Sequence, residues 1–274
     1  MGTLYLIATP IGNLEDISAR ALRLLREVRL IAAEDTRQTG KLLAHFDIHT
    51  ALTSYHEHNK LTKLDRILEA LGEGDVALVS DAGTPALNDP GYELVQTALA
   101  AGYEVSPIPG PSAPISALVA SGLPTDSFLY LGYLPRKGNE RRRLLEQVAE
   151  LPYTLIFLET PHRLLSALED LLALLGDRQA AVARELTKLH EEIFRGRISA
   201  ALVHFEEQGL RGEFTLVVAG KEPEFGRWSR ARVVAALEQG LKKGEAPSRL
   251  AAQVATLSGW TKGEVYPLLE DAKK

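Results

Sequence analysis

The sequence contains no cysteine, and only one of its 274 residues is methionine. Without thiols, disulfide bonds, thiolate nucleophiles and cysteine-ligated zinc sites are all excluded. No apolar stretch reaches the roughly 20 residues that a membrane-spanning helix needs. The first residues, MGTLYLIATPIGN, lack the basic segment that precedes the apolar run of a signal peptide. We therefore expect a soluble protein of the reducing cytoplasm.

Two common nucleotide-binding motifs are missing as well. The chain has neither the G-x-G-x-x-G fingerprint of dinucleotide-binding folds nor the G-x-x-x-x-G-K-[ST] sequence of a P-loop. Its net charge of −5 and pI of about 5.9 give no overall basic field that would attract nucleic acid, which leaves only a local patch for that role. The hydrophobic content of 45% and charged content of 24% are typical of globular proteins.

The first half of the chain alternates short apolar runs with segments of helical periodicity. One helix follows the first run, because Ala21, Leu24, Leu25 and Val28 fall on one helical face. This alternation predicts an open parallel α/β sheet, since parallel strands need crossover connections. The expected strands are 3–9, 29–34, 75–80 and 104–108, and a further helix is expected at 60–71.

The pattern changes after GLPTDS at 122–127, where strand-like runs begin to alternate polar and apolar residues. Such alternation favours a second sheet that is at least partly antiparallel. The expected domains are an N-terminal α/β domain at 1–120, a second α/β domain at 121–225 and a small helical domain at 226–274.

The C-terminal segment predicts helices near 230–243, 247–257 and 261–272. Thr261 and Glu264 have the spacing of a capping box, in which each side chain satisfies a backbone donor at a helix start. Three short helices resemble a helix-turn-helix, but a simple packing appendage fits them equally well. Because the piece is small, we expect it to have little core of its own.

Three unusual loops follow expected strands. They read TPIGN at 9–13, SDAGTPALNDPG at 80–91 and PIPGPSA at 107–113. Parallel sheets bind ligands at the carboxyl ends of their strands, so these loops predict a shared ligand pocket rather than three plain turns. Gly83 would let a ligand approach the backbone, and Asp81, Thr84 and Ser112 would supply polar contacts.

The chain also carries, in order, LYLIATPIGN, IAAEDTRQTG, SYHEHN, VALVSDAGTPALNDPG, PIPGPSA, ETPHRL, ARELTK and GEFTLVVAG. This set resembles the tetrapyrrole-methylase-like (class III) S-adenosylmethionine methyltransferases, and among them those that modify small-subunit ribosomal RNA. The resemblance implies two α/β domains, S-adenosyl-L-methionine in the cleft between them, and a homodimer. It further implies methyl transfer to the ribose 2′-oxygen of a cytidine in the decoding region of 16S ribosomal RNA.

The resemblance assigns roles residue by residue. The cofactor would contact Pro10, Asp81, Gly83, Thr84, Leu87, Ser112, Ala113, Leu158, Leu186 and Glu213. The sequence departs from the family at Ala86, Leu87 and Asn88, where a bulky aliphatic pair and a serine are common, and at Thr160, where serine or alanine is common. These small changes of shape bear on substrate fit more than on cofactor binding.

Basic residues provide the expected RNA contacts. Arg37 and Arg163 follow strand ends, although Arg37 has an ion pair with Asp35 as an equal alternative. The run PRKGNERRR at 135–143 supplies Arg136, Lys137 and Arg141, although such a run is about as often a solvated helix face.

A ribose hydroxyl is a weak nucleophile, so a base or a cation should assist it, and Lys188 and His56 are the expected catalytic residues. No metal is expected, because His56 and His58 lack a third ligand. Two other readings stay open. One is methylation of a small tetrapyrrole, and the other is a non-catalytic RNA-binding factor in ribosome assembly.

Overall fold

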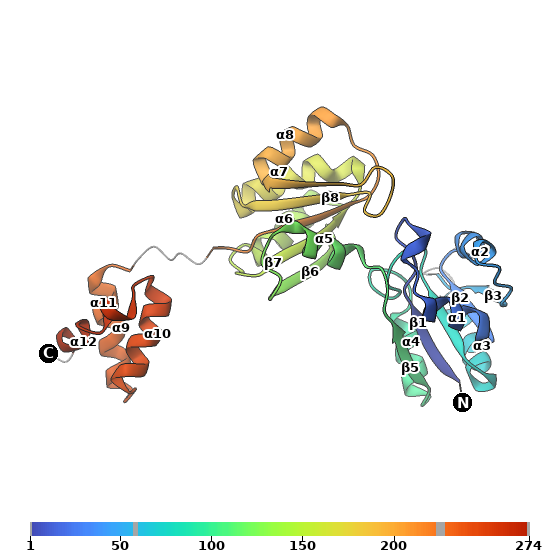
Figure 1. The fold of residues 1–274 in the computed structure, drawn as a ribbon, viewed down its shortest axis with the longest axis horizontal. Helices are drawn as coiled ribbons and strands as arrows, with labels where there is room; N and C mark the ends of the chain where they lie inside the picture. The colour runs from blue at the N-terminus through green and yellow to red at the C-terminus, as the bar shows by residue number, and fades with distance from the viewer. Residues whose placement is uncertain (1, 57–59, 223–227, 273–274) are drawn as a thin grey trace. The chain divides into compact units, whose positions relative to one another are not determined.

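The computed structural model describes residues 2–56, 60–222 and 228–272 (Figure 1). The chain divides into two compact units, Met1–Gly220 and Lys221–Lys274. The boundary expected at 225/226 falls on residues outside the described ones, and the boundary near residue 120 stays a prediction.

The N-terminal part of the first unit is a parallel sheet in the order β3-β2-β4-β1-β5, as the alternation predicted. The sequence analysis missed α2 and β3, and β3 has only three residues, too few to show a period. The elements are β1 (Thr3–Ile7), α1 (Ala19–Glu27), β2 (Leu30–Ala33), α2 (Thr36–His45), β3 (Leu52–Ser54), α3 (Lys60–Glu73), β4 (Val76–Val79), α4 (Tyr92–Ala100) and β5 (Glu104–Ile108), with a 3-10 turn at Leu14–Asp16.

Each face of this sheet has its own apolar core. Helices α1 and α2 pack on one face, where Leu24, Leu25 and Leu43 meet strand residues such as Ile31. Helices α3 and α4 pack on the other face through residues such as Ile67. The four strand residues of β2 and of β4 are therefore all buried, as expected of a sheet covered on both sides.

The rest of the first unit is a mixed sheet in the order β6-β7-β10-β8-β9. Among the described strand pairs of this second sheet, β6 and β7 are parallel and the others are antiparallel, which confirms a partly antiparallel sheet. The elements are α5 (Ala113–Ser121), β6 (Phe128–Tyr133), α6 (Gly138–Val148), β7 (Thr154–Glu159), a 3-10 turn (Pro161–Arg163), α7 (Leu164–Leu175), β8 (Gln179–Arg184), β9 (Glu192–Arg197), α8 (Ile198–Gln208) and β10 (Phe214–Val218).

Helix α5 joins the two sheets. It packs on the second sheet, where Ala117 and Leu118 share a core with Val217 and Leu186. Ile11, from the TPIGN loop after β1, is buried in the same cluster. The N-terminal loop is thus fixed against the second sheet by its apolar side chain, and residues from both sheets meet there. The opposite face of the second sheet is covered by α6, α7 and α8.

The second unit contains α9 (Arg230–Lys242), α10 (Pro247–Ser258), α11 (Lys262–Val265) and α12 (Leu268–Asp271). The expected capping box is present at Thr261 and Glu264. The expected single helix at 261–272 was wrong, because Pro267 has no N–H to continue the helical ladder. The expectation of little core was also wrong: residues such as Val233, Leu237 and Leu250 form a separate apolar cluster.

Candidate functional site

The site begins where β1 and β4 end side by side. The chain leaving β1 enters α1 on one face of the sheet, whereas the chain leaving β4 enters α4 on the other. Such a switch point opens a crevice between the two outgoing loops. A short bridge holds these loops together, since the N–H of Thr9 donates to the carbonyl of Gly83 at 2.9 Å and the N–H of Gly83 donates back at 3.0 Å.

The 80–91 loop has an unusual backbone. Four of its residues have positive φ angles: Gly83 (82°), Ala86 (66°), Asn88 (63°) and Gly91 (151°). Left-handed conformations cost free energy in residues that carry a side chain, and such strain is concentrated at functional sites. The amide of Asn88 lies against Gly132, where a Cβ would come within 2.4 Å of Asn88 Nδ2. The loop is therefore fitted closely to β6 of the second sheet.

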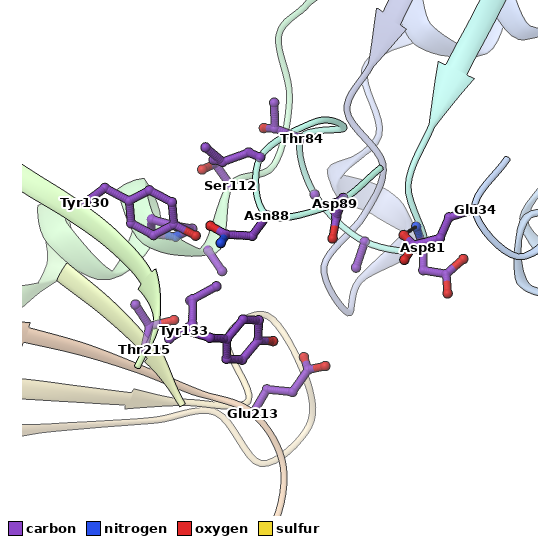
Figure 2. A pocket seen from close by; sticks show the side chains of 16 residues that line it. Glu34, Asp81, Thr84, Asn88, Asp89, Ser112, Tyr130, Tyr133, Glu213 and Thr215 are labelled. Atoms are coloured by element: carbon purple, nitrogen blue, oxygen red, sulfur yellow. Dashed lines mark hydrogen bonds between the residues drawn. The ribbon is translucent and has the colours of Figure 1, made fainter. Parts of the chain in front are cut away.

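This loop forms one wall of a cavity of about 230 Å³, which we call the carboxylate cavity. Figure 2 shows Asn88 and Asp89 of the loop facing Tyr133 and Glu213 from the second sheet. Its lining residues are Glu34, Asp81, Ala82, Gly83, Thr84, Leu87, Asn88, Asp89, Ser112, Ala113, Pro114, Tyr130, Tyr133, Leu158, Glu213 and Thr215.

Three carboxylates gather at one end of this cavity. The N–H of Asp81 donates to Glu34 Oε2 at 3.3 Å, and the N–H of Asp35 donates to Asp81 Oδ1 at 3.1 Å. Burial is the largest cause that raises the pKa of Glu34, Asp81 and Asp89. For Asp89, burial and the nearby charge of Glu34 raise the pKa to about 6. The cavity therefore presents a concentrated negative potential that suits a cationic ligand.

The raised pKa of Asp89 predicts a pH-dependent stability. The native state holds the Asp89 proton more tightly than the unfolded chain, whose aspartates titrate near 3.9. The contribution of Asp89 to stability is therefore greatest below about pH 4 and is lost as the pH rises to about 6. We expect Asp89→Asn to stabilise unit 1 at pH 7 by on the order of 1 kcal/mol, discounted for partial exposure. Urea unfolding followed by circular dichroism at pH 4 and pH 7 measures this gain.

The exposed Asp126 supplies the control, since Asp126→Asn removes the same charge outside the cluster. Equal stability gains in the two variants at pH 7 would contradict the destabilisation that we attribute to the partly buried charge of Asp89.

A second cavity, of about 490 Å³, lies beside the first and is called here the Pro10 cavity. The two cavities share Asp81, Ala82 and Glu213. The other lining residues of the Pro10 cavity are Thr9, Pro10, Ile11, Gly12, Leu14, Gln38, Lys41, Leu42 and Lys188. Two adjoining cavities with common walls provide room for two ligands in contact.

Lys188 is held firmly in the Pro10 cavity. Its Nζ donates to Glu185 Oε1 at 2.8 Å and to Glu213 Oε2 at 3.2 Å. Its stem packs over Gly12, where a Cβ would come within 2.4 Å of Lys188 Cγ. Glu185 and Thr187 have left-handed φ angles of 50° and 66°, so the loop that carries Lys188 is strained.

The sequence left open whether Lys188 would assist as a base or as a cation, and its contacts favour the cation. Burial alone would lower the pKa of Lys188, but the hydrogen bond from its ammonium to Glu185 and the charge of Glu213 offset this, and the pKa is raised. A lysine with a raised pKa is protonated at neutral pH and cannot accept a proton. Its contacts therefore favour the charged form of Lys188.

Eight of the ten expected cofactor residues line the carboxylate cavity, namely Asp81, Gly83, Thr84, Leu87, Ser112, Ala113, Leu158 and Glu213. Pro10 lines the neighbouring Pro10 cavity instead. Leu186 lines neither, because its side chain is buried in the core between α5 and the second sheet.

The expected RNA-binding cations are dispersed. Arg37 is exposed and pairs with Asp35 at 2.7 Å, which is the structural alternative that the sequence left open. Lys137 is exposed and pairs with Glu140 at 3.0 Å. Arg136 and Arg163 line a third cavity, at the end of β6.

The structure corrects the expectation that Arg141 contacts RNA. Its side chain is only 8% exposed, and its Nε donates to Asp170 Oδ2 at 2.7 Å. Helix α6 turns this residue toward α7 because its neighbours Leu145 and Val148 face the same core. A buried guanidinium already committed to a carboxylate cannot hold a phosphate, so Arg141 is removed from the RNA contacts.

The remaining expected catalytic residue, His56, lies next to the carboxylates, close enough for its charge to lower the pKa of Glu34. His56 lines neither of the two cavities, and Glu57 and His58 are outside the described residues. In the described part of the chain, no group of three or more His, Asp or Glu side chains is arranged to hold a metal ion. No helix among the described residues is long and apolar enough to cross a membrane.

Sequence reasoning missed Glu34, Asp89, Tyr130 and Tyr133 as cavity residues. A signal was present for Asp89, which lies inside the quoted 80–91 loop, and for Glu34, which lies in the quoted IAAEDTRQTG at the end of an expected strand. Tyr130 and Tyr133 are three residues apart, and both reach the cavity because β6 bulges between them.

Two α/β layers that share a cavity at the carboxyl ends of parallel strands are typical of enzymes with a small organic cofactor. The chain belongs to the tetrapyrrole methylase family, because the family model described as Tetrapyrrole (Corrin/Porphyrin) Methylases matches residues 3–202. The protein is therefore a methyltransferase that uses a methyl donor.

Two curated relatives carry the name "Ribosomal RNA small subunit methyltransferase I". The protein from Halalkalibacterium halodurans is 51% identical over 270 residues, which cover 97% of this chain and 93% of its own length. The protein from Thermotoga maritima is 51% identical over 223 residues, which cover 81% of this chain and 100% of its own.

Among solved structures, the uroporphyrin-III-C-methyltransferase from Thermus thermophilus is similar to this chain with a TM-score of 0.56. It is 22% identical, and the match covers 80% of this chain and 94% of that one. At that identity the likeness shows the fold alone.

Proposed function

We propose that the protein transfers the methyl group of S-adenosylmethionine to the ribose 2′-oxygen of a cytidine in the decoding region of small-subunit ribosomal RNA. The observation that carries the proposal is the pair of adjoining cavities that share Asp81, Ala82 and Glu213. The names of relatives about half identical to this chain support ribosomal RNA as the acceptor. The homodimer belongs to the same proposal and rests on the family resemblance alone.

The carboxylate cavity would hold S-adenosylmethionine. This donor carries a sulfonium and an ammonium group, and the carboxylates at one end of the cavity complement that charge. The hydroxyls of Thr84 and Ser112 and the side chain of Leu87 offer polar and apolar contacts to a nucleoside. The sulfonium supplies an already activated methyl group, so the protein contributes mainly alignment and charge.

The Pro10 cavity would hold the acceptor ribose. Lys188, kept protonated by Glu185 and Glu213, would stabilise the negative charge that develops on the 2′-oxygen. Asp81 is one of the two carboxylates common to both cavities, and burial raises its pKa. Asp81 would take the hydroxyl proton, and His56, which lines neither cavity, would not contact the acceptor.

The other two readings of the sequence lose support. Methylation of a tetrapyrrole would match the name of the Thermus thermophilus enzyme, but that protein is only 22% identical to this chain. The two relatives named as ribosomal RNA methyltransferases are 51% identical. A non-catalytic assembly factor would not need a protonated lysine beside a second cavity that adjoins the first.

A methylation map at nucleotide resolution tests the function. Small-subunit RNA from cells with and without the gene should differ at one cytidine 2′-oxygen, and purified protein with S-adenosylmethionine should restore the modification. A restored base methylation would refute the ribose acceptor, and no difference at any nucleotide would refute the RNA substrate.

The C-terminal unit should serve substrate binding rather than chemistry. The Thermotoga maritima relative is matched over its full length by 223 residues, which is close to the length of Met1–Gly220. The methyltransferase activity in the name of that relative therefore does not need a second unit of this size. We expect a chain ending at Gly220 to bind S-adenosylmethionine normally and to methylate its acceptor with a raised KM and an unchanged kcat. Steady-state kinetics with small ribosomal subunits measures both values. Loss of cofactor affinity in the folded truncated chain would place the second unit in the active site.

A further inference from the structure

A third cavity, of about 450 Å³, opens at the end of β6 and is called here the Arg136 cavity. It is lined by Tyr133, Leu134, Arg136, Thr160, His162 and Arg163. Tyr133 also lines the carboxylate cavity, so one aromatic side chain separates the two spaces. The size is within the range of small-ligand sites, and the mechanism above leaves the cavity unused.

Arg163 forms a fixed wall of this cavity. Its Nη1 donates to the carbonyl of Leu134 at 3.0 Å, and its Nη2 pairs at 2.5 Å with Glu159, whose side chain is fully buried. Its charge is therefore neutralised by Glu159, and its planar group is held in place by the end of β6. Arg163 shapes the cavity and is not available as a phosphate ligand.

Arg136 and His162 differ from Arg163 because both are exposed. Within the described residues, neither makes a hydrogen bond or an ion pair that would commit its side chain elsewhere. The neighbouring cations are committed, since Lys137 pairs with Glu140 at 3.0 Å and Arg142 pairs with Asp170 at 2.8 Å. Arg136 is therefore an uncommitted arginine in the wall of the Arg136 cavity, whereas Arg143, which is also exposed, does not line it.

Tyr133 supplies an aromatic surface in the same cavity as Arg136 and His162. Its side chain is 49% exposed. Burial of the phenol group, followed by the charges of Glu213 and Asp89, raises the pKa of Tyr133, so the ring stays neutral. The backbone at Gly132 has a φ of 65°, and the bulge there turns Tyr133 toward the cavities. A neutral ring next to an uncommitted arginine can stack a base while the arginine binds a phosphate.

We propose that the Arg136 cavity binds the nucleotide next to the methylated one, with its phosphate on Arg136 and His162 and its base against Tyr133. The inference rests on the proposed function, because it assumes an RNA strand that enters the adjoining cavities. Single-stranded RNA is read by such splayed and stacked bases. The cavity then fixes which nucleotide reaches the methyl donor.

The test uses the full chain and small ribosomal subunits isolated from cells that lack the gene. Arg136→Ala should raise KM about tenfold and lower the salt dependence of log KM by about one unit of slope, as the loss of one phosphate contact does. The kcat and the affinity for S-adenosylmethionine, measured by calorimetry, should not change. Arg20→Ala is the matched control, because Arg20 is an exposed arginine on α1 that lines none of the three cavities.

A second pair of variants tests the ring. Tyr133 also lines the carboxylate cavity, so both variants are assayed at saturating S-adenosylmethionine; Tyr133→Leu, which loses the stacking surface, should then have a KM about fivefold or more above that of Tyr133→Phe, which keeps it. An Arg136→Ala variant that behaves like Arg20→Ala would overturn the inference, and so would equal KM values for the two Tyr133 variants. If wild-type protein methylates no small-subunit RNA, the proposed function itself fails, and the inference fails with it.

Discussion

Replacement of Lys188 by methionine is expected to lower kcat by about 100-fold or more, the usual cost of losing one group that stabilises a developing oxyanion. Methionine keeps the stem that packs over Gly12 and removes only the charge. Lys188 does not line the carboxylate cavity, so the affinity for S-adenosylmethionine should stay unchanged. Single-turnover methyl transfer to small ribosomal subunits, with calorimetry of the donor, separates the two effects.

Lys188→Arg distinguishes a cation from a base. Arginine keeps the positive charge but cannot give up its proton in a protein. If Lys188 acts as a cation, the arginine variant should retain much more activity than the methionine variant. Equal loss in the two variants, with an acidic limb of the pH profile that disappears in both, would instead show that Lys188 works as a base.

The three rim loops could be predicted from sequence because their chemistry is local. Turn residues at 9–13, 80–91 and 107–113 each follow a short apolar run, and the alternation of runs and helices already implies that parallel strands end at one edge. The structure then places β4, β1 and β5 next to one another, so the three loops are neighbours. Strand order itself was not readable from the sequence.

The roles of charged residues could not be predicted, because they depend on partners distant in the chain. Arg141 and Arg136 belong to the same basic run, yet one is buried against Asp170 and the other lines a cavity. Lys188 was a candidate base or cation, and although burial alone would lower its pKa, Glu185 and Glu213 reverse that effect. Glu34 and Asp81 come from loops after different strands, and only the sheet brings them together.

Removal of Arg141 should destabilise the first unit by about 3 kcal/mol or more, because breaking a buried ion pair leaves an uncompensated charge. The guanidinium of Arg141 pairs with Asp170, and both side chains are 8% exposed. Burial alone would raise the pKa of Asp170, but hydrogen bonds from Arg142 and Arg141 lower it. The stabilisation by this carboxylate is therefore present above the pKa of an unfolded aspartate, near 3.9, and is lost as the pH falls below that value.

Arg141→Met should therefore lower the free energy of unfolding at pH 7 far more than Arg142→Met does. The side chain of Arg142 is 60% exposed, and its ion pair is worth at most about 1 kcal/mol. Both tryptophans, Trp228 and Trp260, lie in the second unit, so tryptophan fluorescence follows that unit while circular dichroism also follows the first. The circular dichroism transition in urea should move and the fluorescence transition should not. Arg141→Met combined with Asp170→Leu should recover most of the loss, because an apolar pair leaves no buried charge. If Arg141→Met instead unfolds like the wild type and loses affinity for small ribosomal subunits, the arginine contacts RNA and the buried pair is not its role.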